Sequence, residues 1–372
     1  MEPTKRQSVF ERHPKTTTSI IILFLVLAMD ILAAQILSAA GLYRPQYKIE
    51  RYYRIQHDVF HHTLVKNITH SDARWGPIGY RVDTNSLGFK DRSDRKVALE
   101  TNGQRIVFLG DSFTEGVGYE YTQTFVGLID KSMQSRNIEV LNAAVSSYSP
   151  IIYLRKTEYL INDIGLKFDH LVVFIDISDI EDEAIHYAFD EQRNVVDAPT
   201  SKANEFDERI KRFITEDTIL LSNLRIFLRK LKKSNKEHNK KKIEDALNVF
   251  RGMWTYDETA YEDYGKKGVQ LAVQRMDKLS SLLKQHKIKL SIAVYPWPDQ
   301  IMRGDVNCKQ VTIWQSWASD HNVGFINLFP AFMTGEKAED IIRRYYILGD
   351  VHWNKAGHEL VAKNTLHYLV NH

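Results

Sequence analysis

The apolar positions of the chain follow three patterns along its length. Residues 20–43 form a long apolar run in which the polar side chains are those of Asp30, Gln35 and Ser38. Residues 44–104 are rich in Tyr, His and Arg and show no clear periodicity. From Arg105 onward, short apolar runs alternate with segments of helical periodicity. The pattern predicts a membrane-type helix, an extended N-terminal extension over residues 44–104 that covers part of the main domain, and an α/β domain over residues 105–372.

Five runs of β-branched and apolar residues predict the buried strands of this α/β domain. The predicted strands are Arg105–Leu109, Glu139–Val145, His170–Asp176, Ile288–Pro296 and Val323–Phe329. The predicted helices are Gln123–Ser135, Ile151–Ile164, Val269–His286, Lys309–Asp320 and Lys355–Leu369. Buried strands that alternate with helices indicate a mainly parallel five-stranded sheet between two layers of helices.

The first apolar run is long enough to cross a bilayer as one helix, and we predict a transmembrane helix at residues 20–43. It follows a basic stretch that contains Lys5, Arg6, Arg12 and Lys15. Positive charge marks the cytoplasmic flank, so residues 1–19 are predicted as a cytoplasmic tail. Residues from about Arg44 onward are then predicted to lie outside the cytoplasmic membrane, facing the periplasm or extracytoplasmic space.

Two features complicate this anchor. Asp30 costs a few kcal/mol near the bilayer centre, which the flanking apolar residues can offset, and a partner helix or polar groove could also accept it. The small residues Ser38-Ala39-Ala40 suit a cleaved signal peptide as an alternative. The long lead of residues 1–19 and the late cleavage position favour the uncleaved anchor.

Two segments interrupt the simple order of strands and helices. The residues Asp83 to Phe89 form a run of turn formers, which predicts irregular backbone in the extension. No good strand is apparent between Asp182 and Tyr264, so we predict a helical insertion at about 182–264. Its segment Arg225–Lys242 holds nine Lys or Arg residues, opposed only by Glu237. We favour a solvated helix pair with a Lys-rich turn over the alternative, a basic face that binds anionic lipid headgroups or an anionic polymer.

Composition and charge narrow the function classes. The formal net charge of +3, from 50 basic and 47 acidic residues, gives no bias toward nucleic acid. The single cysteine, Cys308, excludes an internal disulfide and a Cys-rich metal site. The chain has no Walker loop, no dinucleotide-binding glycine fingerprint and no zinc-protease histidine pair. We therefore predict neither a cofactor nor a catalytic metal.

A candidate nucleophile follows the first predicted strand. The strand runs directly into Gly110-Asp111-Ser112, which places Ser112 at the carboxyl edge of the sheet, where open α/β folds bind their ligands. Gly110 permits a sharp turn, and the Ser112 amide can point at a developing anion if it opens a helix. A serine hydroxyl needs a base within hydrogen-bond reach to act as a nucleophile.

The best candidate base lies near the C-terminus, in the segment Asp350-Val351-His352. Histidine has the intrinsic pKa to accept and return a proton near neutrality. Asp350 can orient the ring from the same loop and stabilise the imidazolium. An alternative is a helix N-terminus in which Asn354 is the cap and these residues satisfy backbone groups. Each motif alone leaves that alternative open, whereas their joint presence in one domain favours a catalytic pair.

Four ordered blocks carry a resemblance to the SGNH/GDSL hydrolase superfamily. They are Gly110-Asp111-Ser112, Asn142 to Ser149, Asp176 to Asp179, and Asp350-Val351-His352. The first and last blocks are specific, whereas the middle two are degenerate. Asn85 to Phe89 also resembles a short block of exported members. The resemblance covers residue 105 to the C-terminus without the insertion and implies a flavodoxin-like three-layer fold.

The resemblance implies roles for single residues. Ser112 is the expected nucleophile, His352 the base and Asp350 its orienting carboxylate. In the superfamily, the oxyanion is held by the amide of the nucleophile, a glycine amide of the second block and an asparagine side chain of the third. The matching positions here are Ser147 and Ser178. Ser178 is a shorter donor than asparagine, which leaves weak donation by Ser178, or a role for Asn142 or water, as open alternatives.

Other polar and aromatic residues were weighed for binding roles. His57, Asp58, His61 and His62 could bind a metal if they shared a helical face, but surface or packing roles are favoured. The turn Tyr295-Pro296-Trp297-Pro298, with Trp353 beside His352, could form walls for a sugar ring. Packing in the core or at its rim is an equal alternative.

An anchored domain with serine acyl chemistry resembles proteins that add or remove O-acetyl groups on envelope polysaccharides. This favours ester hydrolysis or acyl transfer, with acetyl as the expected group, on a carbohydrate or other O-acyl ester through an acyl-Ser112 intermediate. A membrane acyl exporter could act as a partner. Two alternatives stay open. One is a carboxylesterase or lysophospholipase at the membrane surface, and the other is an inactive glycan-binding module.

Overall fold

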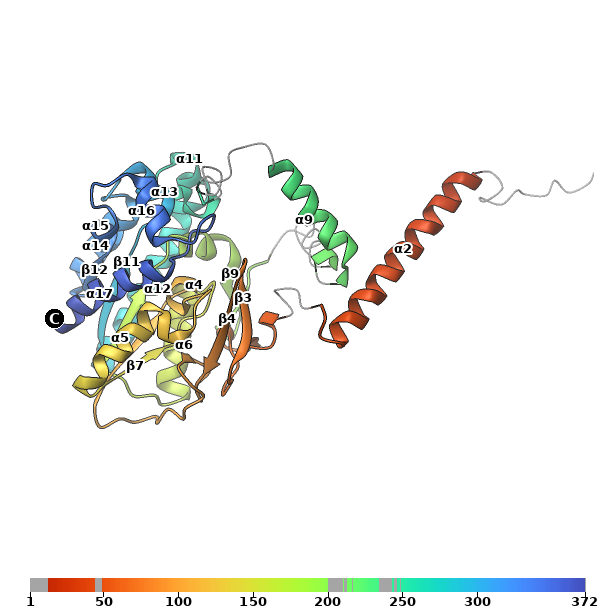
Figure 1. Cartoon of the computed structure of the whole chain (residues 1–372). Coiled ribbons are helices and arrows are strands. Elements are labelled where there is room, and N and C mark those ends of the chain that lie inside the picture. Colours follow the sequence, from red (N-terminus) through yellow and green to blue (C-terminus); the bar gives the residue numbers. More distant parts are fainter. Residues whose placement is uncertain are drawn as a thin grey trace, which may run out of the picture. The chain divides into compact units, whose positions relative to one another are not determined.

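The structure of the chain is a computed structural model that describes residues 13–43, 49–199, 210, 213–215, 217–233, 243, 246–247 and 249–371. Its contacts divide the chain into two compact units. One unit comprises residues 1–49 and 199–236, and the other comprises residues 50–198 and 237–372. The larger unit contains the central sheet and the helices around it (Figure 1).

A mixed sheet of eight strands forms the centre of the larger unit, in the order β12-β11-β8-β6-β7-β5-β4-β3. Five of these strands are parallel, namely β6 (Gln104–Leu109), β7 (Ile138–Asn142), β8 (His170–Phe174), β11 (Lys289–Val294) and β12 (Gly324–Asn327). In chain order they read 2-1-3-4-5 across the sheet, which is the flavodoxin-like arrangement. All five predicted strands are therefore present, and the predicted fold class is confirmed.

Helices cover both faces of the parallel strands and confirm the predicted three layers (Figure 1). The helix α5 packs beside α17, and α6 packs beside α12, so each pair belongs to one layer. The five main helices are α5 (Phe125–Met133), α6 (Pro150–Glu158), α12 (Lys266–Gln285), α14 (Lys309–His321) and α17 (Lys355–Asn371). All five residues of β8 are buried, as expected for a strand covered on both faces.

The N-terminal extension contains more regular structure than its sequence predicted. Its strands β3 (Ser71–Trp75), β4 (Ile78–Thr84) and β5 (Lys90–Asp91) continue the sheet beyond β7 as antiparallel strands. Only one face of β4 meets the core, so β4 alternates buried with partly exposed residues, and its apolar signal is weak. The predicted turn follows β4, with Gly88 at a φ of 74°.

A separate two-stranded hairpin precedes these strands. It is formed by β1 (Arg54–His57) and β2 (His61–Leu64), which pair antiparallel. His57, His61 and His62 therefore lie on a β-hairpin and not on a helix. The metal alternative assumed a shared helical face, so the structure removes its geometric basis.

The insertion also differs from the prediction of helices alone. The strands β9 (Tyr187–Phe189) and β10 (Val195–Asp197) form a short antiparallel pair around a turn at Asp190–Asn194. Three-residue strands with mixed polarity give no detectable periodicity, which explains why the sequence showed no strand there. The remaining short helices are α4 (Ser112–Glu115), α7 (Asp179–Glu181), α11 (Glu258–Ala260), α13 (Pro298–Arg303), α15 (Phe329–Phe332) and α16 (Ala338–Tyr345).

The smaller unit contains the helices α2 (Pro14–Ala39) and α9 (Leu220–Lys233). By length and composition α2 can cross a membrane, and it begins earlier and ends sooner than the predicted run. Gly41, at a φ of 71°, terminates it together with a bond from the Leu42 amide to the Leu37 carbonyl. Residues 1–12 of the predicted tail and residues 234–242 of the Lys-rich segment lie outside the described residues.

Candidate active site

The turn after β6 presents Ser112 at the carboxyl edge of the sheet. The Asp111 side chain caps the short helix α4 by accepting a hydrogen bond from the Phe113 amide at 3.0 Å. A Cβ atom on Gly110 would come within 2.3 Å of Thr114 Oγ1, so the turn requires glycine at this position. The side chain of Ser112 is thereby fixed at the start of α4, as the sequence predicted.

The structure brings Ser112, His352 and Asp350 into one hydrogen-bonded chain. Ser112 Oγ lies 2.7 Å from His352 Nε2, and His352 Nδ1 lies 2.5 Å from Asp350 Oδ1. The His352 amide also donates to Asp350 Oδ1 at 3.0 Å, which fixes the loop around the carboxylate. Ser112 and His352 are 240 residues apart in the chain, so their contact depends on the fold.

The charge on Asp350 determines which atoms donate and which accept in this series of hydrogen bonds. Burial acts to raise the pKa of Asp350, but the hydrogen bonds and charge of His352 hold it below its ordinary value. An ionised Asp350 accepts the proton on His352 Nδ1, which leaves Nε2 as the acceptor that faces Ser112. This is the tautomer that a general base requires.

Three buried carboxyl groups lie beneath the nucleophile. Oxygen atoms of Asp111, Asp176 and Asp179 all lie within 4.8 Å of one another. Burial and the charge of Asp176 raise the pKa of Asp111, and also that of Asp179, well above the ordinary range. Ser112 Oγ donates to Asp111 Oδ2 at 3.0 Å, so this carboxyl group contacts the same hydroxyl as His352.

Hydrogen-bond donors of the protein already face this carboxyl cluster. Tyr295 donates to Asp111 at 3.3 Å, Tyr153 to Asp179 at 2.9 Å, and Trp297 Nε1 to Asp176 at 2.8 Å. A cation at this place would have to compete with these neutral donors. The second acidic group with metal-ligand spacing, Glu181-Asp182-His186, is ion-paired with Arg251.

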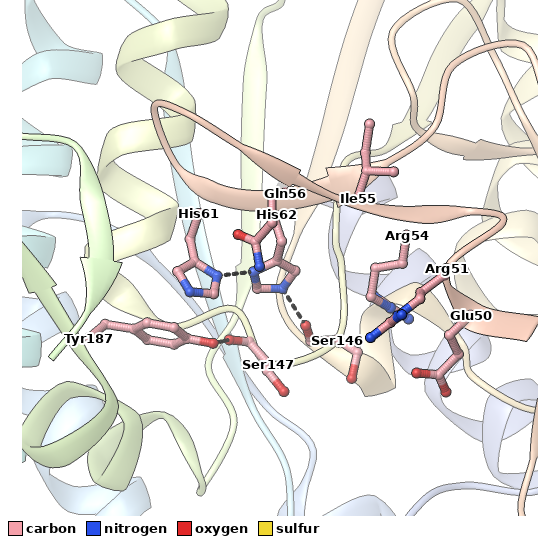
Figure 2. Close-up of a pocket in the computed structure, with 10 residues that line it drawn as sticks. All are labelled: Glu50, Arg51, Arg54, Ile55, Gln56, His61, His62, Ser146, Ser147 and Tyr187. Carbon is pink, nitrogen blue, oxygen red and sulfur yellow. Dashed lines mark hydrogen bonds between the residues drawn. The ribbon is translucent and has the colours of Figure 1, made fainter. Parts of the chain in front are cut away.

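The Ser146–Ser147 loop lies beside α4, since the Ser146 amide donates to Glu115 Oε2 at 2.7 Å. Ser147 has a φ of 65°, the left-handed conformation that glycine adopts most readily. A serine adopts this backbone conformation at a cost in strain of about 1 kcal/mol. The Ser147 carbonyl accepts a hydrogen bond from Tyr187 Oη at 2.9 Å, which holds the loop from outside (Figure 2).

The side chain of Ser178 is hydrogen-bonded to Asp176. Its hydroxyl donates to Asp176 Oδ1 at 2.5 Å, and its amide donates to the same oxygen at 2.7 Å. A hydroxyl has one proton, so this bond removes Ser178 Oγ as a donor to an oxyanion. The sequence alone could not show this, because the bond depends on the direction of the Asp176 side chain.

Two other predicted residues are also engaged elsewhere. Asn142 donates to the Thr114 carbonyl at 2.8 Å and accepts from the Ala144 amide at 3.2 Å, and it is 1% exposed. The structure therefore gives Asn142 a backbone-supporting place and not one at the substrate. Trp353 is 1% exposed and packs against Phe113 and Tyr295 at 4.8 and 4.7 Å, so its ring belongs to the core.

The extension supplies contacts to the triad that sequence reasoning missed. Trp75, at the end of β3, donates from Nε1 to Asp350 Oδ2 at 2.9 Å. Its ring also meets the His352 ring edge to face, with centroids 4.7 Å apart. Trp75 thus holds the second oxygen of Asp350 and shields the imidazole.

The extension also holds the Ser146–Ser147 loop. Arg54 forms a two-point ion pair with the fully buried Glu115, with both N–O distances 3.0 Å. The second oxygen of Glu115 also accepts from the Ser146 amide at 2.7 Å. Despite its burial, which acts to raise it, the charge of Arg54 lowers the pKa of Glu115. The aperiodic sequence around Arg54 contains no motif that reveals this contact.

His62 binds the same loop from the neighbouring strand. Its Nε2 lies 2.8 Å from the Ser146 carbonyl, which can only accept, so Nε2 carries the proton (Figure 2). Burial lowers the pKa of His62 to about 3, so the ring is neutral. His61 Nδ1 lies 2.7 Å from His62 Nδ1 and therefore donates to it.

A polar cavity of about 700 Å³ borders this loop (Figure 2). Residues of the first hairpin and the segment before it line most of the cavity, together with the Ser146–Ser147 loop and Tyr187. The lining residues before this loop are Glu50, Arg51, Arg54, Ile55, Gln56, His61 and His62. Ile55 is the one aliphatic side chain among the described residues that line it. The cavity therefore suits a ligand with many hydrogen-bonding groups.

Comparisons with known proteins give structural matches only. No protein-family model and no curated protein matches the chain. Among the similar solved structures are a psychrotrophic esterase, EstA, from Pseudoalteromonas sp., a lipolytic protein of the G-D-S-L family from Veillonella parvula, and an acetyl xylan esterase. Their identities to this chain are 11%, 14% and 12%, with TM-scores of 0.39, 0.39 and 0.38. They cover 72%, 73% and 70% of this chain and 97%, 100% and 97% of their own.

Proposed function

We propose that the chain is a serine-dependent esterase or acyltransferase that works through an acyl-Ser112 intermediate. The observation that supports this best is the hydrogen-bonded chain from Ser112 through His352 to Asp350, with distances of 2.7 and 2.5 Å. This order of hydroxyl, imidazole and carboxylate is the one that suits a serine nucleophile with a histidine base.

The proposed reaction begins when His352 Nε2 accepts the proton of Ser112 Oγ as the oxygen attacks an ester carbonyl. The tetrahedral intermediate collapses, the proton passes from His352 to the leaving alcohol oxygen, and the acyl group stays on Ser112. Water or a second hydroxyl then attacks the acyl group, and His352 again moves the proton. Asp350 stabilises the imidazolium in both halves.

Backbone amides are the proposed donors to the oxyanion. Ser112 opens α4, so its amide has no acceptor within that helix and can face the carbonyl oxygen of the substrate. The left-handed conformation of Ser147 supports the same role for the Ser147 amide. The Ser178 hydroxyl is held by Asp176, so we propose a supporting place for it and not direct donation.

The polar cavity favours a carbohydrate ester over a long-chain lipid ester as substrate. A long acyl chain requires an apolar channel, whereas the cavity beside Ser147 is lined by charged groups, amides, hydroxyls and imidazoles. We propose that the group transferred or removed is short, with acetyl as the first candidate. The carbohydrate would belong to the cell envelope, and an acyl exporter in the membrane could supply the acyl group.

The proposed location is the cytoplasmic membrane, with the larger unit outside it. The helix α2 is long and apolar enough to act as the single-pass anchor, and the basic residues before it favour a cytoplasmic N-terminus. This location supports an envelope substrate.

Hydrolysis of p-nitrophenyl acetate by the detergent-solubilised full chain tests the proposal. We expect turnover that Ser112→Ala abolishes while the circular dichroism spectrum and melting temperature persist. Ser281→Ala is the matched control, because this exposed serine bonds only to a carbonyl of its own helix among the described residues. Full activity in Ser112→Ala would exclude Ser112 as the nucleophile.

A second assay separates the alternatives. Short-chain esters and transfer to added oligosaccharides support carbohydrate chemistry, whereas preference for long acyl chains supports a lipid esterase. No turnover and no labelling by a fluorophosphonate would instead indicate a glycan-binding module without catalytic activity.

A further inference from the structure

We infer that α9 is a second membrane-embedded element, which runs from the middle of the bilayer to anionic headgroups and is held at its N-terminus by Asp30 of α2. The inference rests on the proposed role of α2 as membrane anchor. It joins two features that the sequence left apart, namely the acidic residue of the apolar run and the basic insertion.

Asp30 is the acidic side chain of α2, and it is 3% exposed; Ala34, one turn further along α2, is also buried. Its Oδ1 accepts from the amides of Ile219 and Leu220, each at 2.8 Å. Its Oδ2 lies 3.2 Å from the Leu221 amide. Asp30 therefore caps the N-terminus of α9, where backbone amides carry partial positive charge.

The position of Asp30 along α2 sets the depth of this contact. Asp30 lies ten residues after Ile20 and nine before Ala39, which is about 15 Å and about 13.5 Å at ~1.5 Å per residue. A hydrocarbon core about 30 Å thick would place Asp30 close to the bilayer centre. At that depth water is absent, so the α9 amides satisfy the carboxylate and the carboxylate satisfies them.

The first turns of α9 expose a set of large apolar side chains. Leu220 is 60% exposed, Leu224 is 50% exposed and Phe227 is 56% exposed. Apolar groups of this size favour a hydrocarbon environment over water. Because α9 starts beside the apolar surface of α2, lipid acyl chains are the partner that would cover them.

The charged residues of α9 follow at its other end. Arg229, Lys230, Lys232 and Lys233 lie in its last turns, and Arg225 precedes them. Arg229 is nine residues after Leu220, or about 13.5 Å along the helix, which is close to half the hydrocarbon thickness. Anionic lipid headgroups would attract this basic end of α9.

Fluorescence quenching by lipids tests this placement in the full chain. A Cys308→Ser background allows an environment-sensitive fluorophore to be attached at Leu224→Cys, with Leu25→Cys in α2 as the membrane reference and the exposed Lys278→Cys as the aqueous reference. The proteins are reconstituted in phosphatidylcholine and phosphatidylglycerol vesicles that carry acyl-chain spin labels. We expect blue-shifted emission and at least twofold quenching at positions 224 and 25, but not at 278.

The outcomes separate this inference from the proposed anchor. Quenching at position 25 without quenching at 224 would overturn the placement of α9 and leave the anchor standing. No quenching at either position would overturn both.

A pair of substitutions tests the contact itself. Asp30→Asn keeps an oxygen that can accept from the α9 amides, whereas Asp30→Ala removes it. We expect quenching at position 224 to persist in Asp30→Asn and to fall at least twofold in Asp30→Ala. Equal quenching in both variants would overturn the role of Asp30 as the attachment point.

Discussion

The two sides of Ser112 are built in different ways. On the base side, His352 and Asp350 come from one loop, and their hydrogen bonds form a direct line to the nucleophile. On the other side, here called the anion side, the Ser146–Ser147 loop carries a proposed donor to the oxyanion, and it is held by Arg54 through Glu115 and by His62. The base side is a local motif, whereas the anion side is assembled from distant segments.

This difference separates residues that would do the chemistry from residues that would shape its surroundings. A substitution on the base side removes a proton-transfer group, so its effect on the rate should be large and independent of stability. A substitution on the anion side moves a loop, so its effect should be smaller and accompanied by a loss of stability.

Removal of the base should give the largest effect. We expect His352→Ala to lower kcat/KM for p-nitrophenyl acetate by about 10⁴-fold, because the nucleophile then lacks a proton acceptor. The melting temperature should change little. His367→Ala, in an exposed part of α17, is the control and should keep full activity. Retention of more than a tenth of the activity by His352→Ala would contradict the base assignment.

Loss of the buried ion pair should lower the activity by an intermediate amount and, unlike loss of the base, should also lower the stability. Arg54→Leu leaves the buried Glu115 carboxylate without its partner, which should cost about 3–5 kcal/mol in the free energy of unfolding. The displaced loop should lower kcat by about tenfold. Urea unfolding and steady-state kinetics measure both, with the exposed Arg136→Leu as control. An unchanged free energy of unfolding would show that the pair does not hold the loop.

His62 should make the anion side sensitive to acid. Burial lowers its folded pKa to about 3, against about 6.5 in the unfolded chain, so the unfolded state binds more protons between these values. The stability from His62 is therefore present above pH 6.5 and lost as the pH falls toward 3. Between pH 7.5 and pH 5, the wild type should lose about 2 kcal/mol more than His62→Gln. Equal losses in urea titrations of both proteins would refute the neutral buried state.

Trp75 should give the smallest effect, since it supports the base side only indirectly. Trp75→Phe keeps an aromatic ring beside His352 but removes the hydrogen bond to Asp350 Oδ2. We expect kcat to fall about fivefold, consistent with the loss of about 1 kcal/mol of hydrogen-bond energy. An unchanged kcat in Trp75→Phe would limit Trp75 to packing.

The same contrast explains what the sequence could predict. Ser112, Asp350 and His352 lie in short blocks whose residue order reflects their chemistry, and the buried parallel strands give continuous apolar runs. The strands β3 to β5 and the contacts of Arg54, His62 and Trp75 lack such a signal, because half-buried strands and single long-range contacts leave no period in the sequence. The hydrogen bond of Ser178 also could not be predicted from the sequence, since it depends on the direction of the Asp176 side chain.

Covalent labelling tests the central claim most directly. The solubilised full chain is treated with a fluorophosphonate, digested, and analysed by mass spectrometry for the modified peptide. The account predicts one adduct per chain, on Ser112, with labelling slowed by orders of magnitude in His352→Ala. Labelling of another serine, or ester turnover with Ser112 unmodified, would contradict it.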